Sequence, residues 1–255
     1  IGSIMPLSEN SFMRRLQVVE YRMTNFYRSL MAHIDTLDVT PGAFSLYRTS
    51  DLKEVGGFDV GNPTEDLEMA WKLRKAGRSL DMVYGYYSNT ELPKNFWELY
   101  NQRVRWARGF MYNAVKHRDI FFNKDLGWFG RFQIPMHTIM PVVALLGLGM
   151  VLFGFFEMIY GQLVTWSAVG FSLPSLGSFH LSRFLLNQQW SIYIPLTFSL
   201  LLTAYLIGLA YSKSGESVRN YPGLVFYFLA FFAVKGFFWT TAVLKEVFQT
   251  KRIWN

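Results

Sequence analysis

The chain has 255 residues, of which 51% are hydrophobic and 18% aromatic, and its formal net charge is +7. It contains no cysteine, which excludes disulfides and thiolate metal sites. The basic balance suits phosphate-bearing ligands or an anionic membrane face. Because the basic residues are interleaved with aromatic residues and adjoin long apolar runs, we do not expect nucleic acid as a partner.

The order of the segments predicts a soluble part followed by a membrane part. Residues 1–94 have the mixed composition of a soluble domain, residues 95–133 the amphipathic pattern of interface helices, and residues 134–255 long apolar runs. The chain opens on Ile1 without an initiator methionine or a signal pattern. We therefore expect it to be an internal piece of a longer protein.

The soluble part begins with predicted helices and strands. Residues 12–32 carry apolar side chains at spacings of three and four, which predicts an amphipathic helix. A short helix is predicted over residues 51–55, and strands are predicted over residues 42–48 and 80–87. We expect the basic side chains of the first helix to be solvated on its other face; they are Arg14, Arg15, Arg22 and Arg28.

A further helix is predicted from its end signals. Asn62 would be the N-cap, Pro63 the first helical residue and Glu65 the acid of a capping box. The helix would run to Ala76 and end at Gly77. Strand–helix–strand alternation beside apolar runs predicts part of an α/β domain that rests on a bilayer.

Three apolar runs predict about three transmembrane helices, since roughly 20 residues span a hydrocarbon core of about 30 Å. Lys235, inside the third run, is expected to snorkel to the interface, although it could face a polar path. Residues 163–179 are not apolar enough to count, and they could be an external loop, a re-entrant segment or a short crossing. Lys and Arg are dense from Arg103 to Arg131, which predicts a multi-pass protein of the cell membrane with this side in the cytoplasm. The three runs are 134–160, 192–211 and 222–244.

A cluster of Gln, Arg and Trp lies on a long helix predicted over residues 96–116. Gln102, Arg105 and Trp106 fall at i, i+3 and i+4, so they project from one face. Arg105 and Gln102 supply donors for a diphosphate, and Trp106 offers a flat platform for a sugar ring. Arg103 points about 100° away. The alternative is an interfacial helix with Trp at headgroup depth and Arg on lipid phosphate.

A candidate base precedes this cluster by about 35 residues, in Thr64-Glu65-Asp66. Transfer of a sugar from a nucleotide diphosphate to a hydroxyl, with inversion, needs a base on the attacking oxygen. Asp66, at a helix N-terminus, can supply one. The alternative is that the acid only stabilises the helix dipole, as Glu65 does in the predicted capping box.

Together the two segments are similar to the TED and QxxRW signatures of processive family 2 glycosyltransferases, the synthases of cellulose, hyaluronan and poly-N-acetylglucosamine. The resemblance covers about residues 12–255 and is greatest to the poly-N-acetylglucosamine synthases. Further segments resemble these synthases in the same order, namely Gln17 to Glu20, Gly42 to Arg48, Gly56 to Phe58, Glu91 to Pro93 and Leu244 to Trp254.

The resemblance implies part of a GT-A-type domain followed by interface and transmembrane helices. It implies that Asp66 is the catalytic base, that Gln102 and Arg105 hold the diphosphate of a UDP-sugar, and that Trp106 lies at the acceptor sugar. It also implies Mg or Mn as cofactor, but the family's uracil-binding aspartates and DxD motif have no counterpart here, so we do not expect metal ligands in this chain. The remaining implied substrate-binding residues are Gly42, Ala43, Phe44, Glu65 and Arg103.

Three functions compete at this point. We expect an enzyme that adds sugars to a growing polysaccharide and exports it, with the UDP-sugar, the polysaccharide and the lipid bilayer as partners. The second is a related enzyme that adds a single sugar to a membrane lipid. The third is a structural or transport component whose transferase-like half is inactive. An accessory subunit or a second copy of the chain is a further expected partner.

Overall fold

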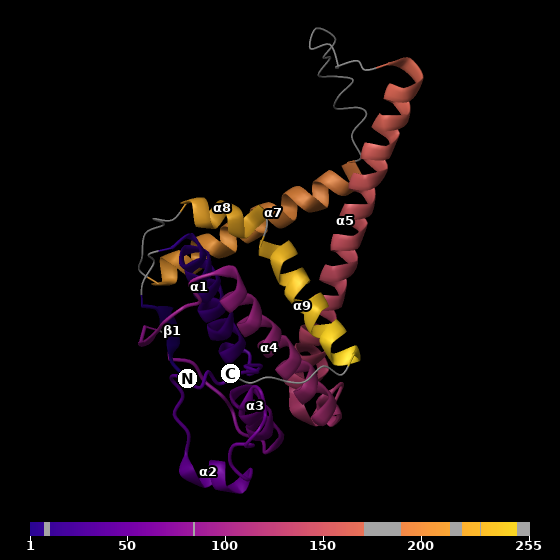
Figure 1. Ribbon diagram of the computed structural model, residues 1–255. Coiled ribbons are helices and arrows are strands. Elements are labelled where there is room, and N and C mark those ends of the chain that lie inside the picture. Colours follow the sequence, from indigo (N-terminus) through magenta and orange to yellow (C-terminus); the bar gives the residue numbers. More distant parts are fainter. Residues whose placement is uncertain (8–10, 84, 171–189, 215–220, 230, 249–255) are drawn as a thin grey trace. The chain divides into compact units, whose positions relative to one another are not determined.

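The computed structural model describes residues 1–7, 11–83, 85–170, 190–214, 221–229 and 231–248. By their contacts these residues fall into two compact units. The first unit comprises Ile1–Leu145 with Ala210–Asn255, and the second comprises Leu146–Leu209. Helices dominate the described residues (Figure 1).

The strands of the first unit differ from the predicted ones. β1 (Ser3–Pro6) pairs in parallel with β2 (Tyr87–Thr90), with Ser3 opposite Tyr87. The strand predictions over 42–48 and 80–87 are wrong. Residues 42–48 instead begin in a turn in which the backbone N–H of Phe44 donates to the carbonyl of Pro41, and residues 80–83, 85 and 86 precede β2 without regular structure.

The predicted helices of the soluble part are present. α1 (Phe12–His33) begins at its N-cap Ser11, whose hydroxyl accepts the backbone N–H of Arg14 at 3.2 Å. α2 (Thr49–Glu54) follows. α4 (Phe96–Lys116) has the predicted bounds. Its N-cap Asn95 accepts the backbone N–H of Glu98 at 3.0 Å, and the Glu98 carboxylate accepts the backbone N–H of Lys94 at 2.8 Å.

α3 (Glu65–Lys75) begins later than predicted. Its N-cap is Thr64, because the side chain of Asn62 accepts the backbone N–H of Thr64 at 3.0 Å and so forms a turn before the helix. The predicted start at Asn62 and the first helical position of Pro63 are therefore wrong. The predicted end is confirmed, since Gly77 adopts the left-handed φ of +72° after the last turn.

Trp71 on α3 is the centre of the core of this unit. Its side chain is 0% exposed, its indole N–H donates to the carbonyl of Asp38 at 3.1 Å, and its ring meets Phe110 of α4 edge-on at 5.7 Å. Buried aliphatic residues surround this pair. The packing fixes α3 against α4, and with them the two motifs found in the sequence.

The apolar runs form helices of unequal length. Three short elements, η1 (Arg118–Ile120), η2 (Lys124–Leu126) and the π-helical η3 (Phe129–Gln133), lead into α5 (Ile134–Val169). The continuous helix Phe129–Val169 is, within the described ranges, the one helix long and apolar enough to cross a membrane. The remaining helices are α7 (Trp190–Ser214), α8 (Tyr221–Leu229) and α9 (Phe231–Val247).

The predicted membrane segments are thus supported for the first run. The third run, 222–244, is covered by α8 and α9 on either side of residue 230, which lies outside the described residues. Of the doubtful stretch 163–179, residues up to Val169 continue α5 and residues 171–179 are not described. The predicted boundaries at residues 94 and 133 stay a prediction.

Candidate active site

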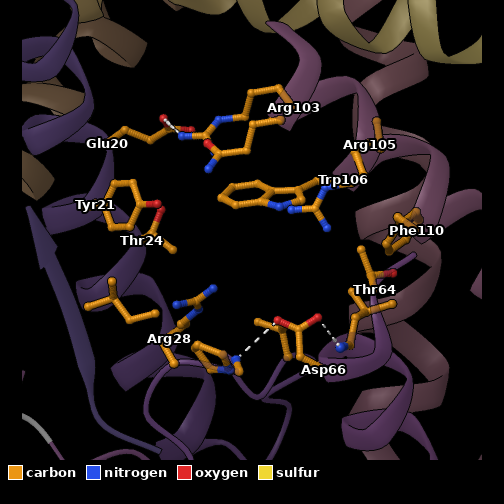
Figure 2. A pocket seen from close by; sticks show the side chains of 18 of the residues that line it. Glu20, Tyr21, Thr24, Arg28, Thr64, Asp66, Arg103, Arg105, Trp106 and Phe110 are labelled. Carbon is orange, nitrogen blue, oxygen red and sulfur yellow. Dashed lines mark hydrogen bonds and ion pairs between the residues drawn. The ribbon is translucent and has the colours of Figure 1, made fainter. Parts of the chain in front are cut away.

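A cavity of about 540 Å³ lies within the first unit (Figure 2). Its walls come from α1, from residues 39–43, from the first turn of α3, from α4 and from α9. Eight of the nine predicted site residues line this cavity, although their segments are far apart in the sequence. These eight are Gly42, Ala43, Glu65, Asp66, Gln102, Arg103, Arg105 and Trp106.

Phe44 is the predicted site residue that does not line the cavity. Its ring lies so close to the backbone of Gly2 that a Cβ at Gly2 would be 2.1 Å from the Phe44 Cδ1. The carbonyl of Phe44 also accepts the backbone N–H of Gly2 at 3.0 Å. Phe44 therefore holds the start of β1 against the 42–48 segment. Its position does not support the prediction that it binds substrate.

The Asp66 carboxylate is held at the cavity wall by backbone donors. Its Oδ1 accepts the backbone N–H of Leu67 at 2.8 Å and its Oδ2 that of Gly42 at 3.4 Å, as the dashed lines of Figure 2 show. Burial, with a smaller contribution from Glu65, raises the pKa of Asp66 above its usual range, although both backbone donors oppose the rise. A carboxylate with a raised pKa is a stronger base.

The segment before Asp66 is fastened to α4 by buried amides. Asn62 Nδ2 donates to Asn113 Oδ1 at 2.7 Å, and Asn113 Nδ2 donates to the hydroxyl of Thr64 at 3.0 Å. Gly109 lets the backbones approach here, because a Cβ at this position would lie 2.4 Å from the Thr64 hydroxyl oxygen. The QxxRW helix and the Asp66 turn are therefore set in register by direct contact.

Arg105 and Trp106 project into the cavity from α4 (Figure 2). One guanidinium nitrogen of Arg105 donates to the carbonyl of Pro63 at 3.0 Å, which anchors the side chain beside the Asp66 turn. Trp106 is 37% exposed, so part of the residue is open to a ligand. These placements fit the predicted clamp and platform.

Arg103 lies differently from the prediction that it points away. It lines the cavity, and its guanidinium stacks over the ring of Trp106 at 4.1 Å. Its nitrogens donate to Gln102 Oε1 at 2.9 Å and to Glu20 Oε2 at 2.7 Å. The positive charge of Arg103 is thus neutralised by the buried carboxylate of Glu20. The oxygen of the Gln102 amide is turned towards this arginine.

Glu20 and Lys235 complete this ion cluster and were missed as site residues. Lys235 Nζ on α9 lies 3.3 Å from Glu20 Oε1, and both residues line the cavity. The prediction that Lys235 snorkels is therefore wrong, because a carboxylate on α1 holds its ammonium. Although burial acts to raise it, the pKa of Glu20 is lowered by Arg103 and Lys235.

The polar face of α1 is the other feature that sequence reasoning missed. Tyr21, Thr24 and Arg28 line the cavity together with Glu20 (Figure 2). The prediction that the basic face of α1 is solvated is wrong for Arg22, which is 7% exposed, and for Arg28, which is only partly exposed. A signal was present, since residues 21, 24 and 28 are spaced by three and four, as one helix face requires.

The acidic residues around the cavity do not fit a divalent metal ion. Among the residues that the structure describes, no group of three or more His, Asp or Glu side chains could hold a metal. Both oxygens of Asp66 accept backbone N–H groups, and Asp38 Oδ2 lies 2.5 Å from the ring of His137. We therefore derive no chemical step through a metal from this chain.

Comparison with known proteins places the chain in a family. The sequence model described as Glycosyl transferase family group 2 matches residues 2–239, so the chain belongs to this family of glycosyltransferases. It is similar to poly-β-1,6-N-acetyl-D-glucosamine synthase of Staphylococcus epidermidis, with 30% identity over 106 residues, 40% of this chain and 25% of that protein. The synthase of Staphylococcus aureus is 24% identical over 137 residues, 53% of this chain and 33% of that protein. The chain thus spans a quarter to a third of the curated relatives that it matches.

Proposed function

We propose that the chain carries the acceptor side and the leaving-group clamp of an inverting membrane glycosyltransferase. The enzyme moves a sugar from a UDP-sugar to a growing polysaccharide. The observation that carries the proposal is the convergence of Asp66, Arg105 and Trp106 on one cavity from two helices. The family match and the names of the two staphylococcal relatives support the transferase class and the polysaccharide product.

Asp66 is the base in this proposal. Its carboxylate takes the proton of an acceptor hydroxyl while that oxygen attacks the anomeric carbon of the donor sugar. The bond from the anomeric carbon to the diphosphate oxygen breaks, and UDP leaves with the negative charge. The reaction balances with one new glycosidic bond, one UDP and one proton on Asp66.

The α4 residues serve the other partners of the reaction. The guanidinium of Arg105 is anchored to Pro63 through one nitrogen, which leaves its remaining donors for the diphosphate as charge develops on it. Gln102 adds a neutral amide. Trp106 supports the acceptor sugar with the exposed part of its ring. Gly42 and Ala43, which line the cavity next to Asp66, border the acceptor.

The proposed location is the cell membrane, with the cavity on the cytoplasmic side. The helix Phe129–Val169, which is long and apolar enough to cross a bilayer, supports membrane attachment. The density of Lys and Arg from Arg103 to Arg131 supports the cytoplasmic assignment.

Product analysis of the protein encoded by the whole gene tests the proposal. The protein in lipid vesicles is given a panel of UDP-sugars with Mg or Mn, and the products are sized and extracted with organic solvent. A long, water-soluble polymer is expected. A single sugar on an extractable lipid would instead favour the lipid glycosyltransferase, and absence of transfer from every UDP-sugar would contradict the proposal.

Asp66→Asn is the first variant to make. We expect transfer to fall by about 10²–10⁴-fold, because the amide cannot accept the proton. Donor binding should stay close to the wild-type value, since no donor contact is assigned to this carboxylate. Asp125→Asn, at an exposed acid outside the cavity, is the matched control and should keep full activity. Normal turnover by the Asp66 variant would sink the assignment of the base.

A further inference from the structure

Arg28 is a cation of the cavity for which the described residues provide no ion pair. Its side chain reaches in from the α1 wall, opposite the α4 wall that carries Arg105 and Trp106 (Figure 2). The side chain is partly buried. Its Nε is closed off from solvent and has no hydrogen-bond partner among the described residues.

The neighbouring acids are engaged elsewhere. Asp38 and Asp66 are close enough to act on Arg28 electrostatically, but neither forms an ion pair with it. The Asp38 carboxylate meets the ring of His137 at 2.5 Å, and the Asp66 carboxylate accepts the backbone N–H groups of Leu67 and Gly42. Arg28 therefore keeps its donors for another group.

The other cations of the cavity are in a different situation. Arg103 and Lys235 share the Glu20 carboxylate, at 2.7 Å and 3.3 Å. Arg105 donates to a backbone carbonyl and has no carboxylate partner within the described part of the chain. Arg28 and Arg105 are thus two uncompensated guanidinium groups on facing walls.

An enclosed, unpaired guanidinium is costly, because desolvation is not offset by an opposite charge. Burial accordingly lowers the pKa of Arg28, which remains protonated at neutral pH because an arginine titrates far above it. Such a group is retained in a binding site when a ligand brings the missing anion. Planar guanidinium groups match phosphate oxygens, to which they donate in pairs.

We propose that Arg28 binds the diphosphate of the sugar donor from the α1 side, opposite Arg105. This assignment rests on the proposed function in taking the anion to be the diphosphate of a nucleotide sugar. Two arginines on different helices would hold the leaving group between them, and Arg28 would neutralise part of the charge that it acquires when the glycosidic bond breaks. Arg28 is then a substrate-binding residue outside both sequence motifs.

The alternative is that Arg28 acts only through Asp66, by favouring its ionised form. The two roles have different signatures. A phosphate ligand changes the affinity for UDP and leaves the affinity for uridine, which lacks phosphate, unchanged. An indirect role moves the acidic limb of the pH–rate profile to higher pH and leaves UDP affinity unchanged.

Equilibrium binding of UDP and of uridine to the whole-gene protein in lipid vesicles tests the proposal. The variants are Arg28→Met, which removes both the charge and the hydrogen-bond donors, and Arg28→Gln, which removes the charge but keeps an amide donor. Arg15→Met, at an exposed position of the same helix outside the cavity, is the control. We expect both Arg28 variants to bind UDP at least tenfold more weakly, with uridine binding within twofold of wild type and the control unchanged.

Unchanged UDP affinity in a folded Arg28→Met or Arg28→Gln protein would overturn the proposal, as would an equal loss of UDP and uridine binding. If both neutral variants fail to fold, Arg28→Lys is the variant to measure. It keeps the positive charge but loses the planar pair of guanidinium donors, so UDP affinity should fall at least threefold. Wild-type UDP affinity in this variant would refute the assignment. UDP binding is independent of product. A wild-type protein that binds UDP but transfers no sugar would therefore refute the proposed function and leave the Arg28 comparison valid.

Discussion

The Asp66 side chain is both partly buried and ionisable, and burying a charged group usually destabilises the folded state. Its carboxylate is supported by two backbone N–H groups rather than by a cation, and burial raises its pKa. The folded state therefore holds the ionised acid at a cost. Such a cost is typical of a group that is kept for chemistry rather than for structure.

The pH dependence of transfer follows from this raised pKa. The base must be ionised, so we expect kcat/KM to fall towards acid with an apparent pKa above the value of about 3.9 for an unperturbed Asp. A pH–rate profile of the whole-gene protein measures this limb. Full activity maintained down to about pH 4 would contradict the assignment.

The same raised pKa fixes the sign of the effect on stability. The unfolding free energy that protonated Asp66 contributes is present below the pKa of the unfolded chain and is lost as pH rises through the higher folded pKa. Asp66→Asn removes this loss. The melting temperature of the variant minus that of wild type should therefore be larger at neutral pH than at acid pH. Thermal unfolding of both proteins at the two pH values measures this difference.

Individual residues show how far sequence patterns reach. Asp66, Arg105 and Trp106 were found because their spacing along two helices matches known signatures, and the structure places all three at the cavity. Arg28 and Lys235 were not found, because their roles depend on which helices meet. A pattern within α1 or within α9 does not say that Glu20 stands between Arg103 and Lys235.

At the scale of elements, the contact between α4 and the turn before α3 determines the site geometry. Helices were predicted well because their signals are local: the caps and the apolar spacing of α1 and α4 lie within each helix. The strands were not predicted correctly, because β1 pairs with β2, which comes from the other end of the soluble part. A two-stranded parallel pairing of this kind depends on tertiary contacts that no local window contains.

Gly109→Ala tests that contact. The added Cβ would lie 2.4 Å from the Thr64 hydroxyl oxygen, and Thr64 is held by Asn113, so α4 must shift away from the Asp66 turn. We expect a loss of about 1–3 kcal/mol in unfolding free energy and a lower kcat. Urea unfolding and initial rates measure the two effects.

Gly149→Ala is the matched control for this substitution. Gly149 is also helical, but nothing lies within 4 Å of the position of its Cβ, so the change should not destabilise the protein and should add up to about 1 kcal/mol from helix propensity. Equal stability and equal turnover of the Gly109 variant and wild type would show that α4 and the Asp66 turn are not closely coupled.

At the scale of the whole molecule, the chain joins a cavity lined by charged and aromatic residues to a helix of bilayer length. The helix Phe129–Val169 has 41 residues, and its apolar window is not buried inside the protein. Its length and apolar composition match those of a segment that crosses a bilayer. In the proposed function, catalysis and membrane attachment are carried by one continuous piece of sequence.

Leu152→Asp tests the membrane assignment of α5. Leu152 is 47% exposed, and a carboxylate near the middle of a spanning helix costs about 2.5–3.5 kcal/mol on insertion. We expect a smaller fraction of the protein to resist carbonate extraction from membranes than for wild type. Leu152→Val is the control, and identical extraction of all three proteins would contradict a spanning role.

The Glu20 cluster also restricts how this sequence can diverge. One carboxylate on α1 serves a cation on α4 and another on α9, so loss of the acid alone leaves two positive charges beside each other. Loss of either cation leaves a neutral pair. In any lineage of relatives, therefore, position 20 should change its charge only after position 103 or position 235 has changed, and sequences that lack the acid but keep both cations should be absent.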